Sequence, residues 1–127
     1  MAIQFSEAEL KIMQVLWERS PQTMPQIAQA LHSETAWSRN TVITLLKRMI
    51  AKGTVCVDES VYPKAYTPLV EQGAIASQET KSLLKRLFKG KPTMLMSNMM
   101  EEGYVTDAEL DEMIQLLQQQ KKKGEFK

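Results

Sequence analysis

The spacing of the apolar residues changes at Gly53, and this change limits the folds open to the chain. Before Gly53 there are three patterns in which apolar residues recur at helical spacing. After it, TVCVDE alternates and is rich in β-branched residues, which is typical of a strand. SVYPK has turn chemistry, and AYTPL fits a short returning strand. Pro63 and Pro68 fit only an edge or a strand end. Three helices and then a two-stranded hairpin is the element order of a winged helix-turn-helix.

Each of the three helical patterns also carries signals for its ends. SEAELKIMQVLWER and TMPQIAQALH each begin with a capping box, led by Ser6 and Thr23 respectively. The third pattern, WSRNTVITLLKRMIAKG, offers Ser38 or Asn40 as its N-cap, and Gly53 suits the position just past its end. The sequence therefore predicts three short, well-delimited helices before the hairpin.

The third helix has an unusual outward face. Its inward side is expected to comprise Val42, Leu45, Leu46 and Met49. The opposite side is small, polar and basic, with one aliphatic group in reach. Asn can pair with adenine, Thr and aliphatic groups can touch a thymine methyl, and Lys can reach guanine. A solvated face is the alternative for the helix alone, but the hairpin favours DNA. The residues expected to contact bases in the major groove are Asn40, Thr41, Ile43, Thr44 and Lys47.

Net charge does not by itself indicate a nucleic-acid partner, because it is only +1. Between residues 39 and 64, however, five positive charges are opposed only by Asp58 and Glu59. A basic surface can therefore be local in a near-neutral chain. The residues expected to contact the DNA backbone are Ser38, Arg39, Arg48, Lys52 and Lys64. We expect Lys64 to lie near the tip of the hairpin.

The second half of the chain reads as three further helices with apolar stripes. We expect a mainly α protein with a small β-hairpin wing, in which residues 1–70 form the DNA-binding head and residues 71–127 a helical dimerisation region. Exposed stripes of Leu and Met call for a partner, most simply a second copy. Packing back onto the same head is the alternative. The residues expected at the dimer interface are Leu83, Leu87, Met96, Leu110, Met113, Ile114 and Leu117.

Other classes of function have little support in the sequence. No apolar run is long enough to span a membrane, and the N-terminus lacks a signal-peptide pattern, so a cytoplasmic protein is expected. His32 and Cys56 are the only residues of their types, and there is no metal-binding cluster or Gly-rich phosphate loop. We expect no enzyme activity, no cofactor and no metal. An adaptor that binds only proteins is the more serious alternative, because winged-helix domains also serve that role.

The chain resembles the penicillinase-repressor family of bacterial winged-helix regulators. The resemblance is carried by LKIMQVLW in the first helix, by the segment from Trp37 to Gly53, and by AYTPLV at the end of the wing. The family pattern is Trp-Ser, then Thr-Val-x-Thr-Leu-Leu-x-Arg-Leu and Lys-Gly, and here Met49 takes the place of the last Leu. The C-terminal helices match mainly in pattern and length. The resemblance therefore covers essentially the whole chain.

The resemblance implies a homodimeric repressor that binds a palindromic operator and dimerises through interlocking C-terminal helices. In the antibiotic-responsive branch, a sensor-transducer protease system leads to cleavage between an Asn and an aromatic residue. The matching positions here are Asn98 and Met99, so the Asn is present and the aromatic residue is not. The copper-responsive branch carries a Cys-rich C-terminal motif. LLQQQKKKGEFK has no Cys or His, which excludes that copper site on ligand chemistry.

Overall fold

The computed structural model describes residues 3–124 and divides into two compact units between Glu79 and Thr80. We call the first unit the head and the second the C-terminal unit. The elements of the head are α1 (Glu7–Glu18), β1 (Gln22–Thr23), α2 (Met24–Thr35), α3 (Arg39–Lys52), β2 (Val55–Asp58), β3 (Ala65–Pro68) and the first part of α4 (Gln72–Leu87). The C-terminal unit holds the rest of α4, α5 (Pro92–Glu101) and α6 (Asp107–Lys123). None of the described helices is both long and apolar enough to cross a membrane.

The helices of the head begin where their capping residues predicted. Ser6 and Thr23 each form a complete capping box, and of the two candidates for α3 the N-cap is Ser38. Gly53 ends α3 in the left-handed conformation, with φ of 83°, which suits a residue without a Cβ. The local sequence therefore fixes both ends of α3, the helix with the unusual outward face.

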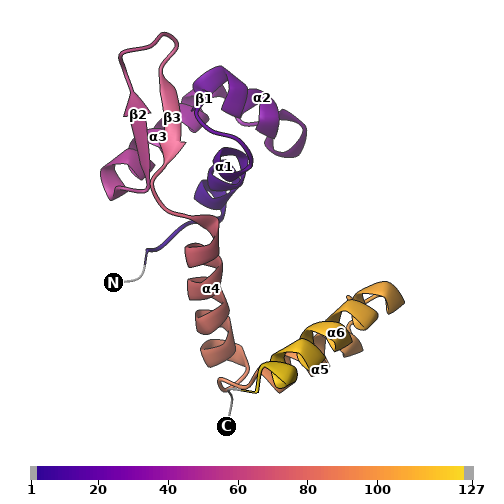
Figure 1. The fold of residues 1–127 in the computed structure, drawn as a ribbon. Coiled ribbons are helices and arrows are strands. Elements are labelled where there is room, and N and C mark those ends of the chain that lie inside the picture. Colours follow the sequence, from indigo (N-terminus) through magenta and orange to yellow (C-terminus); the bar gives the residue numbers. More distant parts are fainter. Residues whose placement is uncertain (1–2, 125–127) are drawn as a thin grey trace. The chain divides into compact units, whose positions relative to one another are not determined.

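The wing is part of a three-stranded antiparallel sheet in the order β1-β3-β2 (Figure 1). In the hairpin, Val57 lies opposite Tyr66 and Asp58 opposite Ala65. The third strand, β1, was not predicted, and it pairs Gln22 with Tyr66 on the other side of β3. A strand of two residues has no alternation to recognise, but it ties the start of α2 to the wing. The arrangement is that of a winged helix-turn-helix.

Helices α1, α2 and α3 and strand β2 enclose the core of the head. The buried apolar residues of this core are Ile12, Met13, Val15, Leu16, Ile27, Leu31, Val42, Leu45, Leu46, Met49 and Val55. Trp17 packs against their edge, and its indole N–H donates a hydrogen bond to the carbonyl of Val70, at 2.8 Å. Side chains of this size contribute roughly 1.5–3 kcal/mol each when fully buried. The head therefore has a core of its own.

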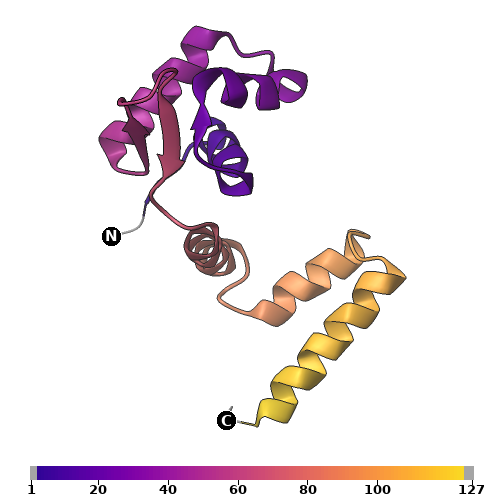
Figure 2. The same ribbon diagram turned by 45° about the horizontal axis from the view of Figure 1, so that its top comes forward.

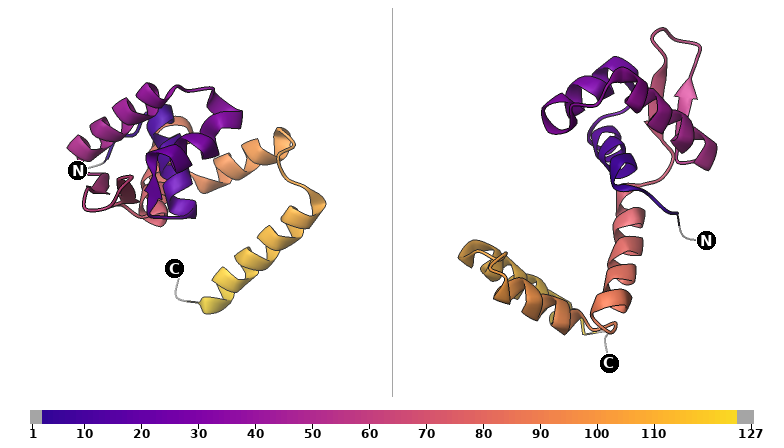
Figure 3. Two further views of the ribbon diagram at one scale, coloured as in Figure 1. Left: turned by 90° about the horizontal axis from the view of Figure 1, so that it is seen from above. Right: turned by 180° about the vertical axis from the view of Figure 1, so that it is seen from behind.

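The first turns of α4 belong to the head, which is why the unit boundary lies later than residue 70. Ile75 is buried, and Gln78 exchanges two hydrogen bonds with the backbone of Ile3, at 3.2 and 2.6 Å. These contacts anchor the start of α4 beside the N-terminal segment of the head. The head can be followed from behind and from above in Figure 3.

The C-terminal unit is built from well-formed helices that bury little. Thr106 caps α6 with a complete capping box, and Gly103 lies between α5 and α6 with φ of 76°. Figure 2 shows α6 turning back after the end of α5. Neither helix has a buried residue, and Leu87, Leu116 and Leu117 are more than half exposed. The apolar stripes of the C-terminal unit are thus left uncovered within one copy.

Candidate nucleic-acid interface

Helix α3 is held in the head by one face, and that leaves the other free. Val42, Leu45, Leu46 and Met49 are each 5% exposed or less and lie in the core. On the opposite side Asn40, Thr41, Thr44, Lys47 and Arg48 are exposed, and Ile43 is half-buried. The structure therefore brings together, on one helix face, all five residues that the sequence predicted as base contacts.

The free face of α3 presents hydrogen-bonding groups beside an open depression. An open depression runs along it, lined by Asn40, Thr41, Thr44, Leu45 and Arg48. The amide of Asn40 both donates and accepts hydrogen bonds, Lys47 only donates, and the threonines add a hydroxyl and a methyl group each. These groups match the pattern of donors, acceptors and methyl groups on base edges in a major groove.

The N-terminus of α3 adds features that suit a phosphate group. Ser38 accepts a hydrogen bond from the backbone N–H of Thr41, at 3.2 Å, and the two hydroxyls lie 3.1 Å apart. Arg39 follows at the first helical position and is exposed. Free N–H groups and the positive end of the helix dipole favour an anion there. Two of the predicted DNA-backbone contacts, Ser38 and Arg39, thus lie at the end of α3 that best attracts a phosphate.

Lys52 has a partner within the head. Its ammonium donates to the carboxylate of Glu9, with Nζ 2.9 Å from Oε1, and also to the carbonyl of Gln4. Arg48 lies farther from the same carboxylate, with Nη1 4.0 Å from Oε2. Glu9 is only 1% exposed, and its Oε2 has no hydrogen-bond partner. The ion pair connects the first turn of α1 to the last turn of α3, so Lys52 helps to fix the position of α3 against α1.

The charge of Glu9 is stabilised despite its burial. Burial raises the pKa of the carboxyl, but two other effects lower it by more. Hydrogen bonds come from Lys52 and from the backbone of Ser6, and positive charge comes from Lys52 and Arg48. The pKa of Glu9 is therefore held below its ordinary value. The sequence identified Glu9 only as part of a capping box. Nothing local indicates its second role, because Lys52 is 43 residues away along the chain.

The wing carries one positive side chain and two negative ones, Lys64 against Asp58 and Glu59. Lys64 lies 3.7 Å from the carboxylate of Glu59, and both side chains are exposed. Asp58 accepts hydrogen bonds from the hydroxyl and the backbone N–H of Ser60, which hold the pKa of its carboxyl below the ordinary value. Tyr62, which the sequence analysis did not single out, is 98% exposed in the turn of the wing. The signal in the sequence that could have identified Tyr62 as an exposed residue is an aromatic side chain within the turn segment SVYPK.

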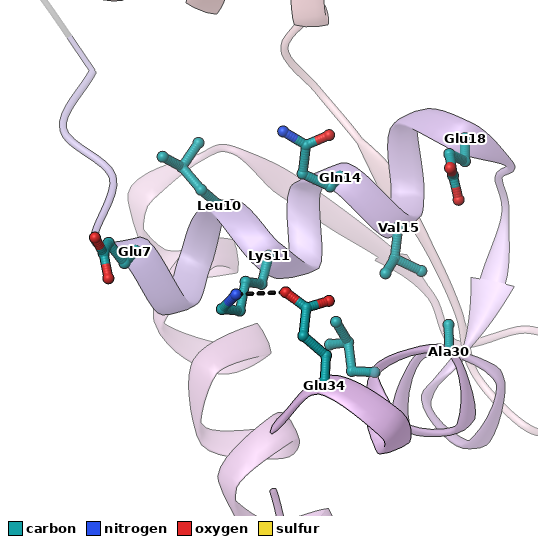
Figure 4. A pocket seen from close by; sticks show the side chains of 9 residues that line it. Glu7, Leu10, Lys11, Gln14, Val15, Glu18, Ala30 and Glu34 are labelled. Atoms are coloured by element: carbon teal, nitrogen blue, oxygen red, sulfur yellow. Dashed lines mark hydrogen bonds and ion pairs between the residues drawn. The ribbon is translucent and has the colours of Figure 1, made fainter. Parts of the chain in front are cut away.

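A groove between α1 and α2 lies apart from the free face of α3. Figure 4 shows its lining, where Lys11 and Glu34 form an ion pair of 2.5 Å between the two helices. Glu7 and Glu18 add further carboxylates, and no predicted DNA-contacting residue lines it. Carboxylates repel phosphates, so this groove is unsuited to nucleic acid.

The described residues offer no constellation for metal binding. Over residues 3–124, no group of three His, Cys, Asp or Glu side chains is arranged to hold a metal ion. Cys56 is exposed. It lies on β2, which pairs only with β3 and is therefore an edge strand.

The residues expected at a dimer interface all lie in the C-terminal unit. Leu87, Leu110, Ile114 and Leu117 are exposed there, by 38 to 63%. Leu83, Met96 and Met113 are half-buried. The candidate cleavage positions lie inside α5, with Asn98 exposed and Met99 half-buried. The structure thus places an uncovered apolar surface where the sequence predicted contact with a partner.

Solved structures similar to this chain match slightly more than half of it. A solution structure of the DNA-binding domain of the repressor BlaI matches with a TM-score of 0.50 and 32% identity, over 54% of this chain and 84% of that one. The monomeric form of Bacillus licheniformis BlaI in complex with the blaP half-operator matches with a TM-score of 0.50 and 31% identity, over 56% and 87%. Both agree with the winged-helix fold described above.

Similarity in sequence extends over nearly the whole chain. The penicillinase repressor of Bacillus licheniformis is 28% identical over 118 residues, which is 93% of this chain and 92% of that protein. The methicillin resistance regulatory protein MecI of Mammaliicoccus sciuri is 25% identical over 114 residues, covering 90% and 93%. The model of the penicillinase repressor family matches residues 5–119. With its winged-helix head and C-terminal helices, the chain belongs to the penicillinase repressor family.

Proposed function

We propose that this protein is a homodimeric transcriptional repressor that binds a palindromic operator by placing α3 in the major groove. The observation that carries the proposal is the free face of α3, where polar and basic side chains are exposed over a well-buried apolar side. A relative of the same family has been solved with a half-operator, which supports a duplex as the partner. The proposed base contacts are Asn40, Thr41, Ile43, Thr44 and Lys47.

The proposed backbone contacts differ in how free their charges are. Arg39 and Lys47 take part in none of the ion pairs formed by the described residues, so their charges are available to a partner. Lys52 is engaged with Glu9, and Lys64 lies near Glu59. Arg48 lies 4.0 Å from Glu9, but its side chain is 54% exposed. We therefore assign most of the phosphate binding to Ser38, Arg39 and Arg48, with smaller contributions from Lys52 and Lys64.

Dimerisation is proposed to occur through the C-terminal unit. One head offers few base contacts, whereas two heads on half-sites about one helical turn apart, or a multiple of it, gain from a high effective concentration. The apolar side chains left exposed on α4 and α6 supply the surface. Proteolysis by a sensor-transducer system would act here: a cut after Asn98 divides α5 and removes α6.

The test is selection of bound duplexes from a random library, followed by titration of the selected sequence at several salt concentrations. We expect a palindrome to be enriched, and affinity to fall steeply as salt rises because phosphate contacts release counterions. A triple variant, Asn40→Ala with Thr44→Ala and Lys47→Ala, should lose the preference for that palindrome. The matched control is the double variant Glu18→Ala with Glu71→Ala, whose residues are exposed and belong to parts of the head other than α3. No enriched motif and no salt dependence would favour a protein-binding adaptor instead.

A further inference from the structure

Between residues 81 and 112 the charges of the C-terminal unit are separated into two blocks, and Lys121, Lys122 and Lys123 follow at the end of α6. The basic segment comprises Lys81, Lys85, Arg86, Lys89 and Lys91, and residues 81–100 contain no Asp or Glu. The acidic segment comprises Glu101, Glu102, Asp107, Glu109, Asp111 and Glu112, and residues 101–112 contain no Lys, Arg or His. All eleven side chains are exposed. Five positive charges are therefore followed by six negative ones with no mixing.

Among residues 3–124, none of these eleven side chains forms an ion pair. The four ion pairs formed by the described residues, Lys11 with Glu34, Arg48 and Lys52 with Glu9, and Lys64 with Glu59, all lie in the head. The polar contacts of the two segments are local ones. Arg86 donates to the hydroxyl of Ser82, and Glu109 completes the cap of α6 with Thr106. The head thus pairs much of its charge internally, and the two segments do not.

The kind of partner follows from the presence of both signs. A nucleic acid would attract the basic segment and repel the acidic one, and a partner of a single sign would satisfy only one of them. A second copy supplies partners for both segments. In a two-fold symmetric dimer, a contact of the basic segment of one copy with the acidic segment of the other is accompanied by the same contact in the reverse direction. The uncovered apolar residues lie on α4 and α6, which also carry three residues of the basic segment and four of the acidic segment: Lys81, Lys85 and Arg86 on α4, and Asp107, Glu109, Asp111 and Glu112 on α6.

We infer that the basic segment of each copy faces the acidic segment of the other and sets the register of the dimer. This rests on the proposed function, because it specifies how the proposed homodimer is assembled. Two apolar stripes of similar side chains can pack against each other in several alignments. Alignments that bring like charges together are disfavoured by repulsion, so the charges select one alignment. The inference makes dimerisation sensitive to salt, since exposed charges are screened over about 8 Å at physiological ionic strength.

The test uses two reversal variants of the full chain, alone and mixed. One carries Lys81→Glu with Lys85→Glu, which lie one helical turn apart on α4. The other carries Asp111→Lys with Glu112→Lys on α6, leaving the capping residue Glu109 intact. A control carries Glu18→Lys with Glu71→Lys, which reverses two exposed charges on the head. Circular dichroism establishes that helix content is retained, and sedimentation at low salt measures the dimer dissociation constant.

We expect each reversal variant to dimerise about tenfold or more weakly than the parent, because several exposed pairs become repulsive in both halves of the interface. The equimolar mixture should recover parental dimerisation as a heterodimer, and the control should match the parent. Reversal variants that dimerise as tightly as the parent, or a mixture that recovers nothing, would overturn the inference. If the parental chain itself were monomeric, the proposed homodimer would fail instead. A loss of half-operator binding confined to the Lys81 and Lys85 variant, with dimerisation unchanged, would assign the basic segment to DNA.

Discussion

Replacing Lys52 should destabilise the head more than replacing Glu9, although both changes remove the same ion pair. The difference lies in what each change leaves behind. Lys52→Met leaves the carboxylate of Glu9, whose side chain is 2% exposed, with one oxygen unbonded and only Arg48 nearby, at 4.0 Å. Glu9→Gln leaves the ammonium of Lys52, whose side chain is 34% exposed and can turn toward water. The amide oxygen of Gln can still accept the N–H bond of Ser6 that Glu9 now accepts at 2.9 Å.

The free energies follow from that difference. An uncompensated buried charge costs about 3–5 kcal/mol, so Lys52→Met should fall in that range. Exchanging a charged acceptor for a neutral one, with the donor near solvent, should cost roughly 1–2 kcal/mol for Glu9→Gln. The double variant leaves no unpaired buried charge and should also cost roughly 1–2 kcal/mol. It is therefore expected to be more stable than Lys52→Met alone.

Urea unfolding followed by tryptophan fluorescence measures these differences, because Trp17 and Trp37 both lie in the head. The pH dependence of the unfolding free energy provides a second test. Since the folded pKa of Glu9 is lowered, its contribution is fully present above the ordinary value of 4.5 and is lost as the pH falls through the folded pKa. In Lys52→Met the penalty comes from a buried negative charge. The stability gap between Lys52→Met and Glu9→Gln should therefore narrow in acid as Glu9 takes up a proton.

Two results would contradict this reasoning. A double variant whose loss equals the sum of the two single losses would mean that Glu9 and Lys52 do not interact. A Lys52→Met protein as stable as Glu9→Gln at neutral pH would mean that the Glu9 carboxylate finds water or another partner when Lys52 is gone. Lys11→Met is a matched control, because Lys11 also forms an ion pair but one whose side chains are 39 and 56% exposed. That change should cost under about 1 kcal/mol.

Three further predictions concern DNA and the dimer. Thr44→Ala or Lys47→Ala should weaken operator binding by roughly 1–3 kcal/mol while leaving non-specific binding nearly unchanged, as competition titrations with unrelated duplexes can measure. Arg39→Gln should lower affinity for all duplexes and reduce the slope of log affinity against log salt by about 1; an unchanged slope would exclude a phosphate contact. Ile114→Asp or Leu117→Asp should give monomers in sedimentation because the dimer would bury an unpaired charge, and intact dimers would exclude these residues from the interface.

Features that depend on neighbouring residues were predictable from the sequence. The capping boxes led by Ser6, Thr23 and Thr106 are all present, because each needs only residues three apart in a defined order. The free face of α3 was predictable for a similar reason, since helical periodicity alone separates Val42 from Thr44. These local signals were sufficient for the order of the helices and for the candidate site.

Features that depend on distant residues were not predictable. Strand β1 forms only because Gln22 meets Tyr66 on β3, and two residues carry no pattern of their own. The ion pair between Glu9 and Lys52 joins the first turn of α1 to the last turn of α3. In sequence both residues look like ordinary charged positions at helix ends. The pair changed the interpretation of Lys52 from a free phosphate ligand to a residue already engaged inside the head.

Truncation after Asn98 should lower affinity for the operator and leave the stability of the head unchanged. The core of the head is complete without the C-terminal unit, whereas α5 and α6 have no buried residues. Asn98 lies inside α5, so a protease must first open that helix, which costs little where few apolar contacts are lost.

The truncated chain should keep the unfolding midpoint of the parent head and bind a single half-site with parental affinity. On the full palindrome it should lose the gain that two linked heads obtain from their effective concentration, a factor of about 10²–10⁴. Sedimentation, urea unfolding and titration of both duplexes measure these three quantities on one preparation. A truncated head that binds the palindrome as tightly as the parent would remove dimerisation from the mechanism. A truncated head that unfolds would show that the C-terminal helices complete its core.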